Sequence, residues 1–411
     1  ALNFSALSLP HAKRSLLSRY FFITLSIIYF ISVPCQGDSF TAKRAGQGFT
    51  AITQDFTSSL SNPALLTKYT KEDDIFVSFN LGGMGSDQYN VVDISETIAQ
   101  ELNSLANDIN NNIANGDYEQ RAKRITEDLA SIDKDVVNVR NGINFQLIIP
   151  NKYLSAGIFT NQFGRIGGAT VYDKADDELL ERSIAQGNLD LSQLKSTANG
   201  IGYSIAETGV MLGYQAIIHA SYELSIGSKV KYQRIDLFYN KLNISEFDDD
   251  KFDLNNEEFL TSDSDVNVDL GLYLNWGDTR QWHLGIVADN LLSRNVQHSE
   301  NSVNFTLAET ATIGFSYHNN WLRLATEIDL IDREHFASLA ASKYAAIGAE
   351  FTVTDTLQLR LGLRSDLNEV DGDLYTLGLG VSPWDILFID LAAFAGNNDT
   401  YGAALQLGLK I

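Results

Sequence analysis

The chain has 411 residues, enough for two or three ordinary domains or for one large β architecture. Its formal net charge of -22 argues against nucleic acid as a partner, because phosphates attract basic surfaces. Hydrophobic residues make up 44% of the chain, yet its mean hydropathy of -0.10 is too low for a bundle of membrane helices. Frequent glycine and aromatic residues, with scarce proline, suit strands that have a small-residue interior and ring-bearing ends.

The first residues have the pattern of an export signal. Lys13, Arg14 and Arg19 form a positive segment, and an apolar run follows over residues 20–33. A helix of that length rises about 21 Å, which is short of the ~30 Å hydrocarbon core of a bilayer. We therefore expect a cleaved signal peptide over residues 1–37 rather than a spanning helix.

The cleavage point has two readings. Small residues at Cys35 and Gly37 favour a cut before Asp38, which would remove the only cysteine and leave a mature chain without disulfides. A lipoprotein cut directly before Cys35 is the alternative, although Pro34 fits a lipobox poorly.

Alternation of apolar with polar or very small residues is the main signal in the rest of the chain. Side chains in a strand point to opposite faces in turn, so each alternating segment has one apolar face and one polar or small face. About 14 such segments occur, an even number within the range of outer-membrane barrels. They are Ile75–Leu81, Ile143–Ile149, Leu154–Thr160, Thr208–Tyr214, Leu224–Tyr232, Val266–Trp276, Trp282–Asn290, Ala311–Tyr317, Leu322–Leu330, Ile347–Val353, Leu357–Leu363, Tyr375–Val381, Leu387–Ala395 and Leu405–Ile411.

The connections between these segments are alternately short and long. The short ones lie near residues 150–152, 216–220, 277–281, 318–320, 354–356 and 382–385. The long ones cover residues 82–140, 163–205, 236–264, 291–309, 331–343 and 365–372, with a brief last one at 396–400. Outer-membrane barrels have short periplasmic turns and long external loops. We therefore predict an all-β fold, a transmembrane antiparallel β-barrel over residues 71–411; a soluble sandwich is the alternative.

Charged residues at the polar or small positions distinguish a barrel lumen from a sandwich core. They are spread along the strands and are Lys229, Lys231, Asp269, Arg323, Glu327, Asp329, Glu350, Arg360 and Arg364. A turn at residues 354–356 would place Glu350 opposite Arg360 on adjacent strands, so we expect an ion pair inside the lumen. The role that we expect for it is structural; a role in selectivity is the alternative.

Two of the long connections carry patterns of their own. An insertion over residues 91–138 has apolar residues every three or four positions, which predicts two amphipathic helices, the first with a capping box at Asp93 and Glu96. We expect these helices to pack on each other; a lid or partner surface is the alternative. A third helix is expected over Asp177–Lys195. The acidic external loop over residues 236–264 is expected to be a solvated face, with calcium binding as the alternative.

Motifs of catalysis do not occur in the sequence. The six histidines are scattered, and the chain has no GxSxG and no HExxH segment. An enzyme would need a general base near a nucleophile. We therefore expect that the protein is not an enzyme and has neither a cofactor nor a metal.

Motifs near both ends of the expected mature chain carry a family resemblance. Phe40–Ala51, Asp55 and Ser61–Leu66 stand near its start, and Leu377–Trp384 and Gly402–Gly408 stand near its end. These segments resemble the TraF-like outer-membrane family named for plasmid conjugal transfer, which is similar to the wider superfamily of the long-chain fatty-acid transporter (FadL). In the first segment, Gly-Gln-Gly stands where relatives tend to have Met-Gly-Gly.

The resemblance implies a 14-stranded barrel with a hatch, formed by residues 38–70, that folds into the lumen from the periplasmic side. Asn62 and Pro63 would begin or end a short helix there, because asparagine is a good N-cap and proline fits a first helical turn. A simple turn before the barrel is the alternative. Phe49 and Phe56 are the hatch side chains that we expect near a ligand.

The resemblance also implies a lateral exit at the third strand, where fatty-acid transporters release their ligands. Gly164, Gly167 and Gly168 follow the third expected strand in this chain. Missing side chains would leave a gap in the wall there. A flexible loop base is the alternative explanation for these glycines.

Two functions follow from these expectations. The first is passive uptake of small hydrophobic molecules across the outer membrane of a Gram-negative bacterium, with membrane lipid around the barrel. The second is a non-conducting scaffold or partner-binding protein of the envelope, conjugation or secretion machinery. Fold analogy points to the first function and the family name to the second. A continuous apolar pocket between hatch and wall would favour transport, and a lumen filled with charged pairs would favour the scaffold.

Overall fold

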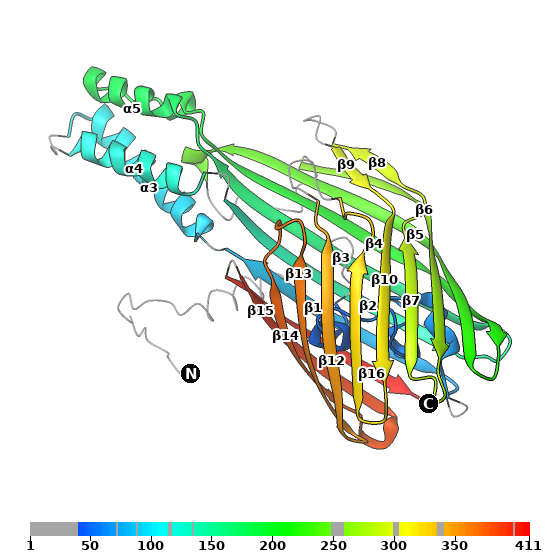
Figure 1. The fold of residues 1–411 in the computed structure, drawn as a ribbon. Helices are drawn as coiled ribbons and strands as arrows, with labels where there is room; N and C mark the ends of the chain where they lie inside the picture. The colour runs from blue at the N-terminus through cyan, green and yellow to red at the C-terminus, as the bar shows by residue number, and fades with distance from the viewer. Residues whose placement is uncertain are drawn as a thin grey trace, which may run out of the picture. The chain divides into compact units, whose positions relative to one another are not determined.

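The computed structural model describes residues 40–411 apart from 71–72, 88, 114–116, 134, 248–258, 299–303, 335–340 and 398. The expected signal peptide and residues 248–258 of the acidic loop lie outside the described residues. In the described part of the chain, fourteen antiparallel strands close into a barrel in which the first strand pairs with the last (Figure 1). The prediction of a 14-stranded barrel is confirmed.

Each predicted segment falls on one strand of the barrel. The strands are β1 (Phe76–Ser86), β2 (Val136–Ile149), β3 (Ser155–Val171), β4 (Thr197–Ile218), β5 (Tyr222–Asn243), β6 (Leu260–Trp276), β7 (Trp282–Asp289), β10 (Thr310–His318), β11 (Leu322–Asp329), β12 (Tyr344–Thr354), β13 (Leu357–Asp366), β14 (Leu374–Val381), β15 (Leu387–Gly396) and β16 (Thr400–Lys410).

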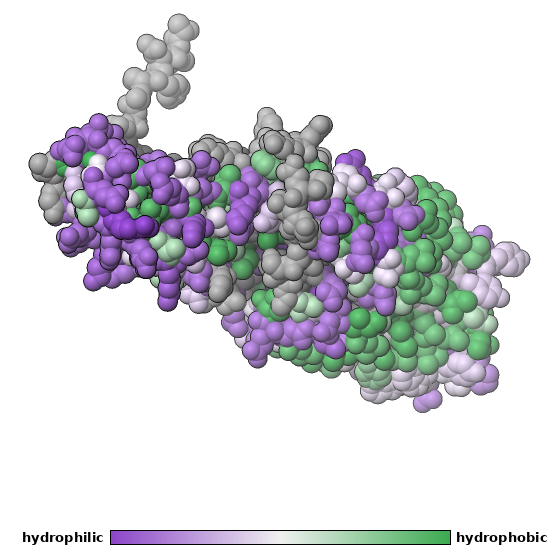
Figure 2. Space-filling model, turned by 90° about the horizontal axis from the view of Figure 1, so that it is seen from above, coloured by the Kyte–Doolittle hydropathy of each residue, from purple (hydrophilic) through white to green (hydrophobic). Residues whose placement is uncertain are grey.

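The outer face of the barrel carries exposed apolar side chains, and the inner face carries buried polar ones. On β5, for example, Ile226 and Val230 point outward and are exposed, whereas Lys229 and Lys231 point inward and are buried. Figure 2 shows apolar side chains gathered toward one end of the molecule and hydrophilic side chains toward the other. This arrangement is what lipid contact around a polar lumen requires. No helix among the described residues is both long and apolar enough to cross a bilayer.

Strands β4 and β5 are much longer than the sequence predicts, with 22 residues each. Beyond Tyr232 the outward positions of β5 change from apolar residues to Arg234 and Asp236, so the alternation that predicted the strand stops while the main-chain pairing continues. The loops predicted over residues 163–205 and 236–264 are correspondingly shorter.

The long connections lie at one end of the barrel and the short turns at the other. Helices α3 (Val91–Asn110), α4 (Tyr118–Ser131) and α5 (Ala175–Gln186) belong to the first two long connections. Figure 1 shows these helices grouped beyond the ends of the strands. Their apolar stripes share one buried cluster, so they pack on each other as expected. Residues of that cluster include Ile98, Leu102, Leu105, Ile109, Ile125, Leu129 and Leu180.

Two details of these helices differ from the prediction. The first helix begins at Val91, where the Asp87 Oδ1 atom accepts the Val91 N–H at 2.8 Å, so Asp93 lies inside the first turn and the predicted capping box is wrong. The third helix ends at Gln186 rather than near Lys195, because Gly187 adopts the left-handed conformation that terminates helices.

A small hairpin that the sequence does not predict lies in the connection between β7 and β10. It consists of β8 (Arg294–Gln297) and β9 (Asn304–Leu307) and forms a separate two-stranded sheet. Its apolar side chains cover the inner face of the extended strands β3 to β5. The shared cluster contains Phe163, Tyr203, Ile205, Ile235, Leu237, Val296, Phe305 and Leu307.

Residues 40–70, here called the plug, lie inside the barrel. The plug contains helix α2 (Ala42–Gly46) and the 3-10 helices η1 (Phe56–Ser58) and η2 (Pro63–Thr67). Helix α2 contacts β13 to β16 and β1, whereas η2 contacts β3 to β6. The plug therefore reaches opposite walls of the lumen. Figure 1 shows it in dark blue within the barrel, toward the short-turn end.

Candidate functional site

Asn62 and Pro63 start helix η2 of the plug. The Asn62 Oδ1 atom accepts the Ala64 N–H at 3.0 Å, and Pro63 occupies the first turn, where no N–H is lost. The Asn62 Nδ2 atom donates to the carbonyl oxygens of Ile52, at 2.9 Å, and Leu272, at 3.2 Å. One asparagine side chain thus caps the helix, ties two turns of the plug together and binds the plug to β6.

Inward-facing glycines of the wall let the plug approach the strand backbones closely. An added Cβ atom at Gly285 of β7 would lie 2.6 Å from the Ile52 carbonyl oxygen, and one at Gly314 of β10 would lie 2.8 Å from the Ile52 Cγ1 atom. Other strands repeat the arrangement, so side chains are missing where the plug touches the wall. The remaining glycines of this set, here called the glycine track, are Gly82, Gly213, Gly227, Gly271, Gly348, Gly362 and Gly378.

Glu327 of β11 binds the turn of the plug formed by residues 50–52. Its Oε1 atom accepts the N–H groups of Ala51, at 2.5 Å, and Ile52, at 2.7 Å. The side chain is buried. Both bonds are charge-assisted when the carboxylate is ionised, which makes them stronger than bonds between neutral groups.

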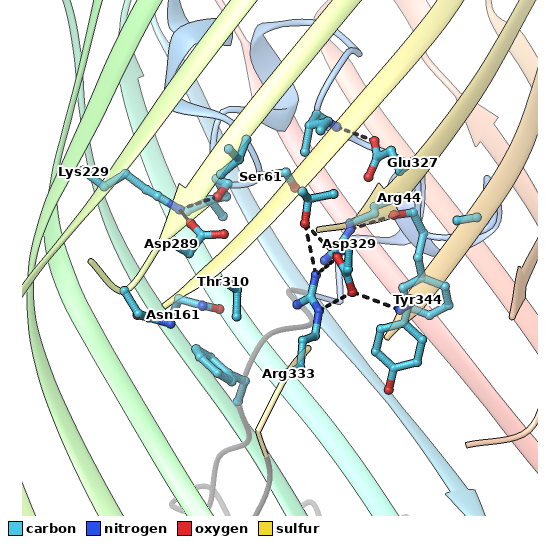
Figure 3. Close-up of a pocket in the computed structure, with 18 of the residues that line it drawn as sticks. Arg44, Ser61, Asn161, Lys229, Asp289, Thr310, Glu327, Asp329, Arg333 and Tyr344 are labelled. Carbon is cyan, nitrogen blue, oxygen red and sulfur yellow. Dashed lines mark hydrogen bonds and ion pairs between the residues drawn. The ribbon is translucent and has the colours of Figure 1, made fainter. Parts of the chain in front are cut away.

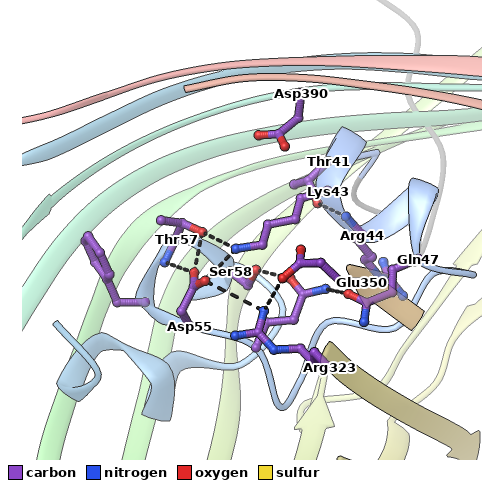
Figure 4. Close-up of polar contacts among 12 residues, drawn as sticks. Thr41, Lys43, Arg44, Gln47, Asp55, Thr57, Ser58, Arg323, Glu350 and Asp390 are labelled. Atoms are coloured by element: carbon purple, nitrogen blue, oxygen red, sulfur yellow. Dashed lines mark hydrogen bonds and ion pairs between the residues drawn. The ribbon is translucent and has the colours of Figure 1, made fainter. Parts of the chain in front are cut away.

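An ion-pair chain connects the plug to the wall on the short-turn side. Lys43 of α2 binds Asp55 at 2.5 Å, and the Asp55 carboxylate also lies 3.9 Å from the guanidinium of Arg323 on β11 (Figure 4). The Asp55 Oδ1 atom accepts the Thr57 N–H at 3.1 Å and so caps η1. Lys43 and Asp55 of the plug therefore pair with each other, and Asp55 also interacts with the wall.

The same chain continues along the wall through Glu350. Arg323 and Arg360 bind the two oxygens of the Glu350 carboxylate at 3.1 and 2.6 Å, and Arg360 binds Asp390 at 2.6 Å. Glu350 and Arg360 are direct partners in the β12–β13 register, so the ion pair predicted from the turn spacing is present. Figure 4 shows Glu350 and Arg323 beside Asp55.

A cavity of about 100 Å³ lies between the plug and the wall, on the side of the long loops (Figure 3). Its apolar lining comes from the plug and from β3 and β7, through Phe49, Ile52, Leu60, Phe163 and Val287. Its charged lining includes Arg44, Lys229, Asp289, Glu327, Asp329 and Arg333. The cavity therefore has both apolar and charged surfaces and is not the continuous apolar pocket that a long hydrocarbon chain would need.

Two lysines of β5 are neutralised next to this cavity. Lys229 and Lys231 each lie 2.9 Å from an oxygen of Asp269, and Lys231 also lies 2.8 Å from Glu207. The Lys229 ammonium donates to the Leu60 carbonyl oxygen of the plug at 3.0 Å. Buried charges must be paired in this way, because an unpaired charge in a low-dielectric interior is very costly.

Nearer the long loops, a second cluster reaches across the lumen. Asp371, between β13 and β14, binds Arg140 of β2 and lies 3.2 Å from Arg165 of β3. Tyr344 of β12 donates to Asp371 and accepts from Arg140 at 3.1 Å. Burial disfavours the charged carboxyl, but the two arginines outweigh that effect and hold the pKa of Asp371 well below its usual range.

The predicted hatch side chains have different surroundings. Phe49 faces the cavity, and its ring lies 4.1 Å from the Arg364 guanidinium carbon. Phe56 instead packs on Phe76 at 5.3 Å between ring centroids, in an apolar cluster on the short-turn side, and is not among the residues that line the cavity. Of the other predicted lumenal charges, Asp329 binds Arg333 at 2.7 Å beside the cavity.

The three glycines of the expected lateral gap lie inside β3, not after it. Gly164, Gly167 and Gly168 pair with β2 on one side and with β4 on the other without a break. The alternation of outward apolar residues ends near Thr160, but the main-chain pairing of β3 with β2 and β4 continues, so the strand is longer than its sequence pattern. A lateral exit at this point would require those paired strands to separate.

The glycine track and the contacts of Lys43, Asp55 and Arg323 were not predicted from the sequence. The track glycines stand at inward positions of most of the barrel strands, a pattern that marks close approach of another backbone, so the track was detectable. The part of the plug that each glycine meets was not predictable, because the plug and the wall bring together residues up to 363 positions apart.

Comparisons with known proteins agree on the fold. Residues 59–329 match a family model described as "F plasmid transfer operon, TraF, protein". No curated protein matches the chain. Among solved structures, the toluene transporter TbuX of Ralstonia pickettii has a TM-score of 0.52 at 10% identity, over 91% of this chain and 98% of that one. A FadL homologue of Pseudomonas aeruginosa has a TM-score of 0.51 at 11% identity, over 92% and 99%.

A mutant of the monoaromatic hydrocarbon channel TodX is similar to the same degree, with a TM-score of 0.51 at 10% identity over 90% of this chain and 98% of that one. At such identities the likeness concerns the fold alone.

Proposed function

We propose that this chain, which belongs to the family of the F plasmid transfer operon protein TraF, is an outer-membrane channel for uptake of small, largely hydrophobic molecules. The observation that carries the proposal is the cavity between plug and wall inside a closed barrel with an apolar outer face. Export through a cleaved signal over residues 1–37 and a hatch role for residues 38–70 are parts of the same proposal.

The size and lining of the cavity limit the ligand. A volume of about 100 Å³ is below the ~150 Å³ of an engineered apolar cavity that holds benzene. Phe49, Ile52 and Phe163 offer ring and aliphatic contacts, and charged groups face them. The cavity as it stands is thus too small for a whole aromatic ring, and a single-ring or longer ligand would pass only if the plug moved. Solved proteins of the same fold include a toluene transporter, so single-ring hydrocarbons are the first ligands to test.

A scaffold role in conjugation or secretion is the second candidate. It is favoured by the ion pairs that cross the lumen, since Asp55 with Arg323 and Arg140 with Asp371 would hold a fixed, closed barrel. The family description points in the same direction. No catalytic role is proposed.

Uptake of radiolabelled toluene and of a labelled fatty acid by cells with and without the gene separates the two candidates. The channel proposal expects slower uptake of at least the small aromatic probe in the deletion strain, restored by the intact gene. Unchanged uptake of both probes, together with a loss of plasmid transfer or of envelope assembly, would leave the scaffold in its place.

A further inference from the structure

The turn at residues 50–52 of the plug separates the cavity from the short-turn end of the barrel. Phe49 and Ile52 line the cavity, together with Leu60 from a later part of the plug. Along β5, the plug contacts Gly227, and the cavity residues Lys229 and Lys231 follow toward the long loops. A ligand in the cavity therefore has the plug between itself and the short turns.

The two halves of the plug are attached to the wall in different ways. The half that contains η2 sits against Gly213, Gly227 and Gly271, is bonded to β6 through Asn62, and continues directly into β1. The covalent connection to β1 and the Asn62 hydrogen bond therefore hold this half in place.

The half that contains the turn at residues 50–52 has a different seat. The turn lies against Gly285 and Gly314, which have no side chains to obstruct its movement, and Glu327 binds it to the wall through two main-chain N–H groups. Within the plug, Asn62 binds the Ile52 carbonyl oxygen, and the preceding helix α2 rests on β13 to β16. Glu327 also lines the cavity. The Glu327 carboxylate is therefore in contact both with the cavity and with the turn at residues 50–52 that separates the cavity from the short-turn end.

We propose that Glu327 is the latch of an exit from the cavity: when its carboxylate releases Ala51 and Ile52, the turn moves away from β10 and β11 and opens a path along Gly285 and Gly314 to the short-turn side. This places the exit inside the lumen rather than through β3, whose pairing with its neighbours is continuous. The inference rests on the proposed channel function and adds the residue that regulates it.

Ion conductance of the purified full chain in planar lipid bilayers tests the latch. Glu327→Ala removes both hydrogen bonds to the turn, so we expect the time-averaged conductance to rise about tenfold or more over the unaltered protein. The matched control is Asp390→Ala, which removes another buried wall carboxylate, one that binds Arg360 and does not line the cavity. We expect this control to remain closed.

A disulfide between Ile52→Cys and Gly314→Cys tests where the path opens. The Gly314 Cβ position lies 2.8 Å from the Ile52 side chain, so the two cysteines can tether the turn to β10. When these substitutions are combined with Glu327→Ala, the protein should be closed under oxidising conditions and should conduct after reduction. Conductance that persists with the disulfide formed would place the leak elsewhere and overturn the proposal.

A second route to the open state guards against a folding defect in Glu327→Ala. Gly314→Ala adds a Cβ atom in the space of the Ile52 side chain and should raise conductance while Glu327 is still present. If folded preparations of both variants, identified by their heat-dependent gel shift, are as silent as the unaltered protein, the latch is refuted.

Salt conductance does not depend on the natural ligand, so the two proposals can fail separately. If the variants conduct but uptake of hydrophobic probes does not depend on the gene, the latch proposal stands and the uptake function is refuted. If the variants do not conduct but uptake depends on the gene, the uptake function stands and the latch proposal is refuted.

Discussion

Asp371 is the residue on which the long-loop end of the lumen most depends. Its carboxylate lies between Arg140 and Arg165 of neighbouring strands, and all three side chains are buried. Asp371→Asn would remove the negative charge that lies between two buried guanidinium groups. We expect it to lower the free energy of unfolding by about 3 kcal/mol, the range for breaking a buried ion pair. Chemical denaturation in detergent measures the change.

The control for Asp371→Asn is Asp332→Asn, in the neighbouring connection after β11. Asp332 is half exposed and binds Lys343 at 3.1 Å. Exposed ion pairs contribute little, so we expect no measurable change. Equal effects of the two substitutions would show that the buried cluster has no special importance.

The pH dependence of the same residue has a definite sign. The folded-state pKa of Asp371 lies below its ordinary value of 3.8, so its contribution to stability is complete above that value and is lost as the pH falls through the folded-state pKa. The difference in melting temperature between the unaltered protein and Asp371→Asn should therefore be constant above about pH 5 and shrink below about pH 4. A difference that grows on acidification would contradict the assignment.

At the scale of elements, the fit of the plug to the glycine track makes a separate prediction. A Cβ atom at Gly227 of β5 would overlap the backbone of Pro63 and Ala64. We expect Gly227→Ala to displace η2 at a cost of about 1–3 kcal/mol, typical of overpacking. Trypsin should then cleave the folded barrel after Lys68, which is largely buried in the unaltered protein.

Gly168→Ala in β3 is the matched control for this substitution. The nearest atom to its added Cβ is the Asn199 carbonyl oxygen, 3.8 Å away, which is ordinary contact. Protection of Lys68 should be unchanged. If Gly227→Ala also leaves Lys68 protected from trypsin, the position of η2 does not depend on the absence of a side chain at residue 227 of β5.

The barrel strands were predictable from sequence because each has an apolar outward face that repeats every second residue. The same reasoning could not extend β5 past Tyr232, because Arg234 and Asp236 break the pattern while the pairing with β4 and β6 continues. It also missed hairpin β8–β9, whose short strands gain their apolar surroundings only from the distant inner wall of β3 to β5. Alternation at every second residue indicates which environment each face of a strand contacts; it does not indicate how far the main-chain hydrogen bonding extends.

The candidate site was predictable only where its partners are close in sequence. Glu350 and Arg360 flank one tight turn, so symmetry about that turn gives their contact. Asn62 and Pro63 carry the local chemistry of a helix start. Glu327 and its partners in the plug are 275 residues apart or more, and no local pattern connects them.

At the scale of the whole molecule, the outer face and the lumen have opposite requirements. The lumen holds charges in pairs, and one chain of pairs joins the plug to the wall through Lys43, Asp55 and Arg323. Along the middle of β5, the outer face exposes Ile226, Val230 and Tyr232 and carries no charged side chain. A closed barrel satisfies both, because each of its fourteen described strands pairs with a neighbour on either side, so the wall has no free strand edge.

A lysine scan of one face tests whether lipid surrounds this barrel. Ile226 is exposed near the middle of the apolar part of β5, and Ile218 is exposed at the end of β4, beside a short turn. In a bilayer, Ile226→Lys should cost about 2–4 kcal/mol and Ile218→Lys about 0–1 kcal/mol, because the cost of a charge depends on its depth. Denaturant unfolding in phospholipid vesicles measures both. If both positions faced water, the two substitutions would have equal and small effects. That result would mean that the apolar band does not face lipid, and it would contradict the proposal of an outer-membrane channel.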